Sequence, residues 1–386
     1  MTKSDDKRVP ALRFKGFTDE WEQRKLGDYG SVAMNKRIFK NQTNTNSGVP
    51  FYKIGTFGKK ADAFISKKLF EEYRKKYPYP KKGDLLISAS GSIGRVIEYT
   101  GQQAYYQDSN IVWLNHNDNL ENIYLKAYYQ IIHWSGIEGS TIKRLYNKNI
   151  LNTKIYVPIK DEQFKVGTII DQIEKLITLQ QRKLRQLKLL KNALLKRMFT
   201  AKKSPTLRFR DFSKDWKLHK LQDITDRLDN ARVPVTASKR IAGSTPYYGA
   251  NGIQDYVKGY THDGEFLLVA EDGANNINDY PVICAKGKIW VNNHAHVLQA
   301  KNKKIDILFL MYALKFLNMK KYLVGGGRSK LNAETMMKLA LKLPELDEEH
   351  NIGVLIKNMD VLITQYKYRI QKINKFKQFL LQNMFI

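Results

Sequence analysis

The segment PIKDEQFKVGTIIDQIEKLITLQQRKLRQLKLLKNALLKRMF, residues 158–199, occurs a second time as PELDEEHNIGVLIKNMDVLITQYKYRIQKINKFKQFLLQNMF, residues 344–385. The two copies align without a gap at a constant offset of 186 residues, so that Pro158 corresponds to Pro344. Identical residues are spread along the whole alignment, and both copies end in Leu-Leu-x-x-Met-Phe. This repetition predicts a chain of two related halves, each of which ends in the repeated segment.

Both copies predict a long helix with one apolar stripe. Their apolar positions alternate by four and three residues, and an average spacing of 3.5 is that of a coiled-coil seam. We expect the two helices to pair antiparallel, with Asp161 and Asp347 as N-caps. The alternative is two surface helices on separate cores, but a helix about 57 Å long would extend beyond an ordinary domain. The predicted seam comprises Ile170, Ile173, Ile177, Leu184, Leu187, Leu194, Ile356, Met359, Ile363, Ile370, Ile373 and Leu380.

Two lysines interrupt this seam at equivalent positions, Lys191 and Lys377. A lysine at such a position usually lies at the edge of the seam with its ammonium group in water. The sharper hypothesis is that the pair helps to fix the register or the direction of the helices.

A second repeat opens each half. PALRFKGFTDEW at 10–21 returns as PTLRFRDFSKDW at 205–216, whereas the middles, roughly 30–138 and 225–324, do not align by eye. The sequence therefore predicts domains at 1–157 and 201–343, each followed by a helical segment, at 158–200 and 344–386. If a pseudo-twofold axis relates the halves, Ile386 should lie near Pro10, as Phe199 should lie near Pro205.

The middles contain short strand-like segments separated by turns. We expect strands at 50–54, 84–88, 95–99 and 111–114 and a helix near 122–133 in the first half. In the second half we expect strands within 245–253, 265–270 and 288–291, and a helix at 305–317. Helices and strands do not alternate regularly, which argues against a doubly wound sheet. The predicted fold class is α+β, with two α/β domains and a long antiparallel two-helix coiled coil.

The composition favours a polyanionic partner. The chain has 386 residues, a formal net charge of +29 and a pI of about 9.8. Nucleic acid is the simplest partner for such an excess, although a Lys-rich composition that affects only solubility is the alternative. A single cysteine, Cys284, excludes an intramolecular disulfide. The N-terminus resembles no signal peptide and no apolar run has the length of a membrane helix, so a cytoplasmic location is expected.

The sequence contains no recognisable catalytic or cofactor motif. There is no Walker A sequence, no Gly-x-Gly-x-x-Gly loop after a strand, and no Asn-Pro-Pro-aromatic motif of amino-methyltransferases. His294 and His296 alternate on a possible strand, but two histidines without a third ligand are a weak metal signal, and hydrogen bonding is the better interpretation. We expect a chain that is not itself an enzyme and that holds no metal or cofactor.

Taken together, the repeated frame resembles the specificity (S) subunit of type I restriction-modification systems over essentially the whole chain. The resemblance rests on the two Pro-x-Leu-Arg-Phe-x-x-Phe-x-x-x-Trp openings, and on the run Tyr-Tyr-Gly-Ala-Asn-Gly-Ile that begins at Tyr247. It rests also on the segment 83–95 and on Glu-Asp-Gly at 271–273 followed by Val-Asn-Asn-His at 291–294. One departure is Glu349, where the family commonly has Gln.

The resemblance implies that each of two target-recognition domains reads one half of a bipartite, asymmetric DNA site. It implies that the helices, including the seam residues named above, dock methyltransferase subunits, and that restriction subunits join through them. S-adenosylmethionine, ATP and Mg would then be bound by the partners only. The competing interpretation is a stand-alone DNA-binding regulator or architectural protein, which would have no catalytic partners.

Candidate DNA contacts fall into two classes. Polar residues near the ends of predicted strands could contact bases or nearby backbone, and basic residues in the aligned Gly-containing turns 139–145 and 325–331 could contact phosphate. Each could instead make a structural hydrogen bond or belong to a solvated connector. The candidates are Ser90, Ser92, Arg95, Lys143, Arg144, Asn275, Asn276, Asn292, Asn293, His294, Arg328 and Lys330.

Overall fold

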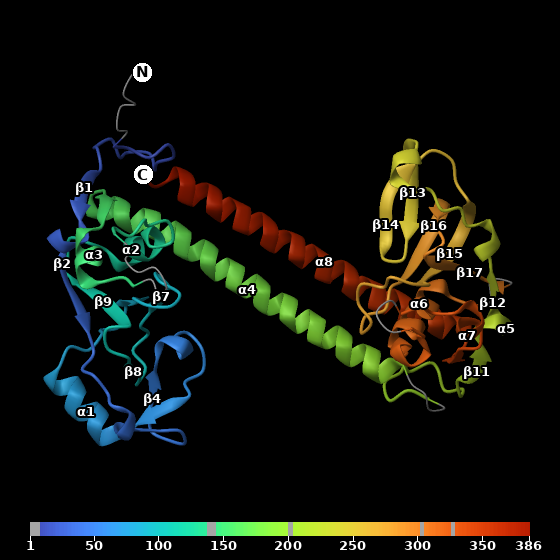
Figure 1. The fold of residues 1–386 in the computed structure, drawn as a ribbon, viewed down its shortest axis with the longest axis horizontal. Helices are drawn as coiled ribbons and strands as arrows, with labels where there is room; N and C mark the ends of the chain where they lie inside the picture. The colour runs from blue at the N-terminus through green and yellow to red at the C-terminus, as the bar shows by residue number, and fades with distance from the viewer. Residues whose placement is uncertain (1–7, 137–143, 200–203, 302–304, 326–328) are drawn as a thin grey trace. The chain divides into compact units, whose positions relative to one another are not determined.

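A computed structural model describes residues 8–136, 144–199, 204–301, 305–325 and 329–386 (Figure 1). The chain divides into two compact units, of which unit 1 comprises residues 1–180 and 369–386 and unit 2 comprises residues 181–368. Because the boundary crosses both long helices, each unit contains one part of each helix. The four-segment division made from the sequence, which treats the helices as separate segments, stays a prediction.

The repeated segments form the two long helices, α4 (Lys160–Met198) and α8 (Leu346–Asn383). The predicted N-caps are wrong, because Asp161 and Asp347 are the second residues of α4 and α8 and the N-cap positions lie two residues earlier. The amides of Glu162 and Gln163 already bond the carbonyl of Ile159, so α4 begins before Asp161. The two carboxylates still stabilise the N-termini of the helices, because they lie near the positive end of the helix dipole.

Within unit 1 the two helices pack against each other in opposite directions. Ile170 and Ile177, near the start of α4, belong to the same core as Leu380 and Met384, near the end of α8. Figure 1 shows these parts side by side, α4 in green and α8 in red. Because the beginning of one helix meets the end of the other, the pairing is antiparallel, as predicted for two halves related by a pseudo-twofold axis.

Unit 2 repeats this arrangement with the helices exchanged. Met198 and Phe199, at the end of the first repeat, share a core with Ile352 and Ile356, near the start of α8. Seam residues farther from the cores, such as Leu184, are partly buried. The pattern of buried and partly buried residues confirms an antiparallel helix pair rather than two independent surface helices.

The two seam lysines form equivalent ion pairs. In unit 1, Lys377 Nζ lies 2.7 Å from Glu174 Oε1, and in unit 2, Lys191 Nζ lies 2.5 Å from Asp360 Oδ1. Glu174 corresponds to Asp360 by the same offset that relates the lysines. Antiparallel packing thus places a carboxylate of the other helix beside each ammonium group, and both pairs remain partly exposed. Partly exposed pairs of this kind contribute up to about 1 kcal/mol each.

Buried arginine–glutamate pairs tie each opening segment to a helix. Arg13 donates from Nε and Nη2 to Glu162 at 2.7 and 2.8 Å, and Arg208 donates to Glu348 at 2.7 Å with both groups. Both carboxylate side chains are fully buried, and hydrogen bonding to them raises the pKa of each guanidinium. These pairs explain why the Leu-Arg-Phe motif and the helix-start glutamate are repeated together.

The opening segments also contact the ends of the helices. The Leu12 amide donates to the carbonyl of Asn383 at 2.7 Å, and the Leu207 amide donates to the carbonyl of Arg197 at 3.0 Å. The two bonds are equivalent under the repeat. The first bond lies within three residues of both Pro10 and Ile386, which agrees with the predicted proximity of these two residues.

Two equivalent glycines allow close packing on the long helices. A Cβ atom on Gly167 would lie 2.6 Å from the backbone carbon of Ile123, at the start of α2. A Cβ atom on Gly353 would lie 3.0 Å from both the Asp306 carboxylate and the Phe309 amide, at the start of α6. Both repeats have glycine at this position because the first residues of α2 and α6 pack closely against the long helix there, which leaves no room for a side chain.

Unit 1 contains a two-stranded antiparallel sheet, β1-β10, and two four-stranded sheets with the orders β2-β9-β6-β7 and β3-β5-β4-β8. Its strands are β1 (Glu22–Lys25), β2 (Gly30–Met34), β3 (Thr43–Asn44), β4 (Val49–Tyr52), β5 (Ala63–Ile65), β6 (Leu85–Ser88), β7 (Val96–Glu98), β8 (Tyr105–Tyr106), β9 (Ile111–His116) and β10 (Lys154–Val157). Its shorter helices are α1 (Lys67–Lys76), α2 (Asn122–Tyr128) and α3 (Asn147–Asn152). The predicted helix at 122–133 is thus real but ends five residues early.

Unit 2 contains the sheet β11-β18 and a six-stranded sheet with the order β12-β17-β15-β16-β13-β14. Its strands are β11 (Lys217–Lys220), β12 (Thr225–Arg227), β13 (Ala242–Gly249), β14 (Gly252–Val257), β15 (His262–Ala270), β16 (Val282–Val291), β17 (Ala295–Ala300) and β18 (Ala340–Leu343). Its shorter helices are α5 (Leu221–Ile224), α6 (Ile307–Phe316) and α7 (Ala333–Met337).

The middles that do not align by eye nevertheless share strand pairings. In unit 1, β6 lies between β9 and β7, and in unit 2, β15 lies between β17 and β16. Moreover, β4 pairs parallel with β8, and β13 pairs parallel with β16. Phe-Tyr at 51–52 and Tyr-Tyr at 247–248, each preceded by a proline, occupy these parallel pairs. The two middles are therefore variants of one α/β scaffold.

Candidate nucleic-acid interface

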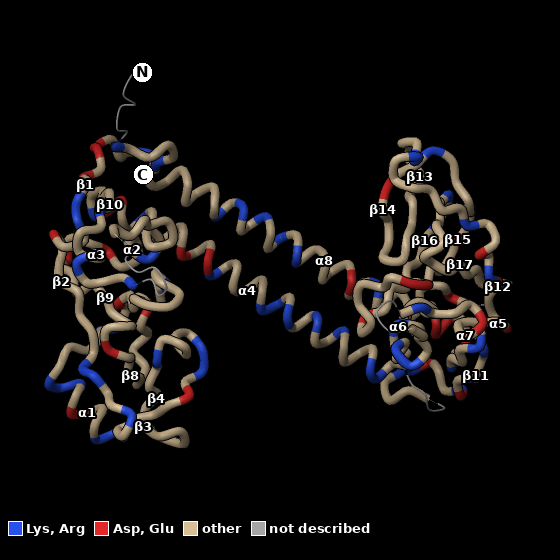
Figure 2. Tube along the Cα trace, in the orientation of Figure 1, with Lys and Arg blue, Asp and Glu red and all other residues tan. Residues whose placement is uncertain are grey.

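The positive charge is distributed over both units and along both long helices, with acidic residues interspersed (Figure 2). Within the described residues, no group of three or more His, Cys, Asp or Glu is placed to hold a metal ion. Over the same part of the chain, no helix is long and apolar enough to span a bilayer. The predicted contacts lie in loops at the ends of strands in both units.

The loop after β6 holds the predicted contacts of unit 1. Ser90 is nearly buried, and its Oγ donates to Asn110 Oδ1 at 2.7 Å. Arg144 Nη2 donates to the same oxygen at 3.3 Å. Ser92 and Arg95 are exposed, with Arg95 Nη2 3.5 Å from the Gly58 carbonyl. The structure thus brings Ser90 and Arg144 together through Asn110. The predicted contact Lys143 lies outside the described residues.

The corresponding loop of unit 2 follows β15. Exposed Asn275 donates its amide to Asn251 Oδ1 at 2.9 Å. Asn276 Oδ1 accepts from the amides of Asn278 and Asp279, so this side chain shapes its own turn. The carboxamide of Asn276 is exposed all the same. Both asparagines therefore combine a structural hydrogen bond with a position on the surface.

The turn between β16 and β17 holds the remaining predicted residues. Asn292 is buried, and its Oδ1 accepts from the His294 amide at 2.9 Å, which fixes the turn. Asn293 is exposed. His294 Nδ1 lies 2.6 Å from Asp272 Oδ1, in the loop after β15. The turn between β16 and β17 is thus linked to the neighbouring loop by a histidine–carboxylate contact.

The two histidines have different roles. His296 is buried, and its ring nitrogens contact Asp229 Oδ2 at 2.7 Å and the Leu331 carbonyl at 2.9 Å. Both ring nitrogens are therefore used within the fold, as expected from hydrogen bonding rather than metal ligation. The side chain of His294 is 37% exposed and remains accessible.

A buried charge network supports these loops in unit 2. Glu271 Oε2 accepts from Arg232 Nη1 at 2.7 Å, and Glu271 Oε1 lies 2.7 Å from Lys330 Nζ. Burial would raise the pKa of Glu271, but hydrogen bonds from Lys330 and Arg232 outweigh burial and lower it. Burial is likewise outweighed at Asp229, whose pKa is lowered by hydrogen bonds from His296 and the Val297 amide. The loops are therefore held by ionised carboxylates. The predicted contact Arg328 lies outside the described residues.

Asn110, Asp272 and Glu271 belong to these clusters, although none of them was among the predicted contacts. Asn110 follows Ser109, whose φ of 54° is the only left-handed value at a non-glycine residue in the described chain. Such a backbone conformation costs on the order of 1 kcal/mol or more and is enriched at functional sites. The polar run Asp-Ser-Asn at 108–110, directly before a strand, was the available sequence signal.

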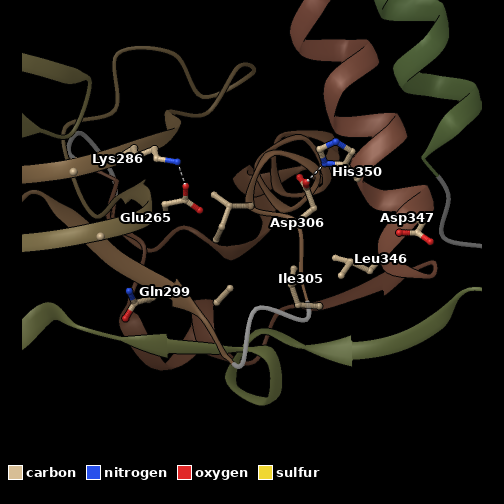
Figure 3. A pocket seen from close by; sticks show the side chains of 12 residues that line it. Glu265, Lys286, Gln299, Ile305, Asp306, Leu346, Asp347 and His350 are labelled. Atoms are coloured by element: carbon tan, nitrogen blue, oxygen red, sulfur yellow. Dashed lines mark hydrogen bonds and ion pairs between the residues drawn. The ribbon is translucent and has the colours of Figure 1, made fainter.

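A hollow of about 830 Å³, with a lining of mixed polarity, lies beside the start of α8 in unit 2 (Figure 3). Its lining includes an ion pair between Lys286 and Glu265, and His350 Nδ1 lies 3.0 Å from Asp306 Oδ2. A second hollow, of about 650 Å³, lies beside the start of α4 in unit 1. In Figure 3, Lys286 faces Glu265 and His350 faces Asp306.

The fold and loops define a duplicated α/β protein on an antiparallel helix pair, and comparisons with known proteins identify its family. A model of the type I restriction modification DNA specificity domain matches residues 18–189 and 213–375. The chain belongs to this family.

Individual relatives agree with this assignment. The chain is 55% identical over 152 residues to a Haemophilus influenzae protein named as a type I restriction enzyme specificity subunit, covering 39% of this chain and 40% of that protein. It thus spans less than half of that relative. It is 23% identical over 396 residues to a Methanocaldococcus jannaschii protein named as the MjaX specificity subunit, covering 93% and 91% of the two chains.

The fold matches a solved structure over nearly its full length. The crystal structure of the type I restriction-modification system S subunit from M. genitalium superposes with a TM-score of 0.68, covering 98% of this chain and 99% of that one. The sequence identity is 15%, so the match concerns the fold.

Proposed function

We propose that this chain is the DNA-reading subunit of a type I restriction-modification complex and that each unit reads one half of a bipartite, asymmetric site. The observation that carries the proposal is a duplicated frame with unlike loops. Equivalent pairs, Arg13 with Glu162 and Arg208 with Glu348, hold both halves in the same way, while the loops after β6 and β15 carry different side chains. A net charge of +29 would supply salt-dependent attraction to phosphates.

The chain acts without chemistry of its own in this proposal. S-adenosylmethionine, ATP and Mg would bind to methyltransferase and restriction subunits, and this chain would determine where they act. The complex would work in the cytoplasm. Incubating the purified chain with DNA, Mg and a methyl donor should give neither methylation nor cleavage, and either reaction would contradict this part of the proposal.

The long helices offer a docking surface that differs from the predicted one. Seam residues such as Ile173 and Ile363 are buried against the rest of the chain, so they are unavailable to a partner. Large apolar residues are exposed elsewhere on the helices. They include Leu176, Leu179, Phe376 and Phe379 in unit 1, and Leu189, Leu190, Val361 and Leu362 in unit 2. We propose these exposed residues, in place of the seam, as the contacts for methyltransferase subunits.

The repeat provides matched variants for the docking experiment. Leu190 and Phe376 are equivalent, and each is about half exposed. Leu190→Glu and Phe376→Glu should each reduce co-purification with methyltransferase subunits from the native host by about tenfold or more, while exposed Lys188→Glu should not. Absence of any larger subunits from the wild-type preparation would favour the stand-alone regulator.

The DNA-reading part of the proposal is tested by mapping methylated bases in the host genome with and without this gene. A two-part motif that disappears with the gene is the expected result. Affinity of the assembled complex for duplexes containing that motif should fall steeply with salt, because phosphate contacts release counterions. Methylation that persists unchanged without the gene would contradict the proposal.

A further inference from the structure

The loops after β6 and β15 are built on the same hydrogen bonds. In unit 1 the Ala89 amide donates to the Asn110 carbonyl at 2.8 Å, and the Leu145 amide donates to the Ala89 carbonyl at 2.8 Å. In unit 2 the Glu271 amide donates to the His294 carbonyl at 2.8 Å, and the Leu331 amide donates to the Glu271 carbonyl at 2.7 Å. Position 89 therefore corresponds to position 271, and position 110 corresponds to position 294.

Two further features extend this correspondence. The glycine two residues farther along each loop is left-handed, with φ of 66° at Gly91 and 65° at Gly273. Isolated antiparallel bridges join Ser90 to Arg144 and Asp272 to Lys330, and residues 144 and 330 are related by the 186-residue offset. Each unit thus has a set of three polar residues in the same frame. Set 1 is Ser90, Asn110 and Arg144, and set 2 is Asp272, His294 and Lys330.

Set 1 leaves a hydrogen-bond donor available. Asn110 Oδ1 accepts from Ser90 Oγ at 2.7 Å and from Arg144 Nη2 at 3.3 Å. Arg144 fixes the orientation of the carboxamide, because a guanidinium can only donate and the amide nitrogen of Asn110 could not accept from it. The Nδ2 group has no partner within the described residues, and Asn110 is partly exposed.

Set 2 leaves an acceptor available. Asp272 Oδ1 lies 2.6 Å from His294 Nδ1, so the carboxylate holds the ring proton on Nδ1. In the neutral ring, Nε2 then carries a lone pair, and the side chain is 37% exposed. Lys330 does not compete for this nitrogen, because its ammonium group pairs with Glu271.

We propose that these two sets are equivalent base-reading sites of opposite hydrogen-bonding polarity, an inference that rests on the proposed function. Asn110 donates to an acceptor in the major groove, which is guanine O6 or N7, adenine N7 or thymine O4. His294 accepts from an exocyclic amino group, which is adenine N6 or cytosine N4. Backbone hydrogen bonds determine the conformation of both loops, so the side chains can differ without changing that conformation.

The substitution Asn110→Asp tests the polarity of set 1. It retains an oxygen for Ser90 and Arg144 and replaces the available donor with an acceptor. At one base pair of one half-site, discrimination for the wild-type base should fall by about 10- to 100-fold, and bases that present an amino group should be favoured. The substitution His294→Ala should relax one base pair of the other half-site by a similar factor.

The readout is the methylated motif produced by the full chain assembled with methyltransferase subunits from its native host. Asn46→Asp, an exposed change of the same charge in unit 1, is the matched control and should leave the motif unchanged. A wild-type assembly without a bipartite motif would overturn the proposed function itself. A bipartite wild-type motif that both variants leave unaltered would overturn this inference alone. Should Asn110→Asp lose its fold by circular dichroism, the His294→Ala result decides.

Discussion

Glu349 is expected to make unit 2 less stable as pH rises. It is almost completely buried, and its Oε2 accepts from the Asp306 amide at 2.8 Å. The equivalent residue in unit 1 is Gln163, whose Oε1 accepts from the Glu121 amide and whose Nε2 donates to the Pro158 carbonyl. A protonated carboxyl can reproduce this donor and acceptor pair, whereas a carboxylate cannot.

Burial raises the pKa of Glu349 from 4.5 to about 8. The hydrogen bond from the Asp306 amide acts in the opposite direction and lowers this pKa, whereas the negative charge of the Asp306 carboxylate raises it further. Below pH 4.5 both the folded and the unfolded state hold the proton, so there is no penalty. Between pH 4.5 and about 8 only the folded state keeps the proton, and each pH unit costs about 1.4 kcal/mol. The cost is about 3 kcal/mol at pH 7 and stops growing above pH 8.

Glu349→Gln should therefore stabilise unit 2 by about 3 kcal/mol at pH 7, or roughly 6–12 °C in melting temperature for a unit of this size. At pH 5 the gain should be less than about 1 kcal/mol. Calorimetric scans between pH 5 and 8.5 measure the difference. Glu345→Gln, an exposed neighbour, is the control and should show no such trend. A gain that is the same at pH 5 and pH 8 would refute the titration argument.

Three further predictions concern the frame. Arg208→Ala leaves the Glu348 carboxylate buried without its partner and should cost about 3–5 kcal/mol in urea unfolding, whereas exposed Arg210→Ala should cost less than about 0.5 kcal/mol. Replacing both Lys191 and Lys377 by Leu should alter melting cooperativity or oligomeric state, as seen by calorimetry and light scattering; no change would make the lysines incidental to pairing. A permutant that joins the chain ends by a short linker and opens near residue 202 should fold, and its aggregation would contradict the pseudo-twofold arrangement.

The long helices could be predicted because the repeat and the 3.5-residue spacing are both visible in the chain, and their antiparallel direction was implied by the pseudo-twofold relation of the halves and by the family resemblance. The ion pairs of Lys191 and Lys377 could not be predicted, because the spacing of the seam does not show which residue of the other helix lies opposite each lysine. Once antiparallel pairing is known, Glu174 and Asp360 become obvious, because the same offset relates them. The N-cap error at Asp161 has a local cause, since the helix begins one residue before the first acid.

The reading loops were harder to predict, because their correspondence lies in backbone hydrogen bonds and not in side chains. Ser90 and Asp272 share a position but no chemistry, and the few identities around them, such as Gly91 with Gly273, do not suffice to align the middles by eye. Ser90 and His294 could be identified as candidate contacts from the sequence. Their side-chain partners, Asn110 and Asp272, could not. Contacts between residues that are 20 or more positions apart, such as Ser90 with Asn110, require the strand pairing to be known first.

The interactions that hold the fold are separate from the proposed base-reading residues in unit 1 but not in unit 2, which affects how each unit could change its DNA specificity. The Arg13–Glu162 pair fastens the opening segment to the start of α4 and makes no hydrogen bond to set 1. The effects of substitutions on the free energy of unfolding are nearly additive when the sites share no partner. Substitutions at Asn110 should therefore leave the stabilisation by the Arg13–Glu162 pair unchanged. Set 2 is less independent, because Lys330 shares Glu271 with Arg232, which bonds the Ala295 carbonyl. We therefore expect specificity changes in unit 1 to be tolerated more readily than those in unit 2.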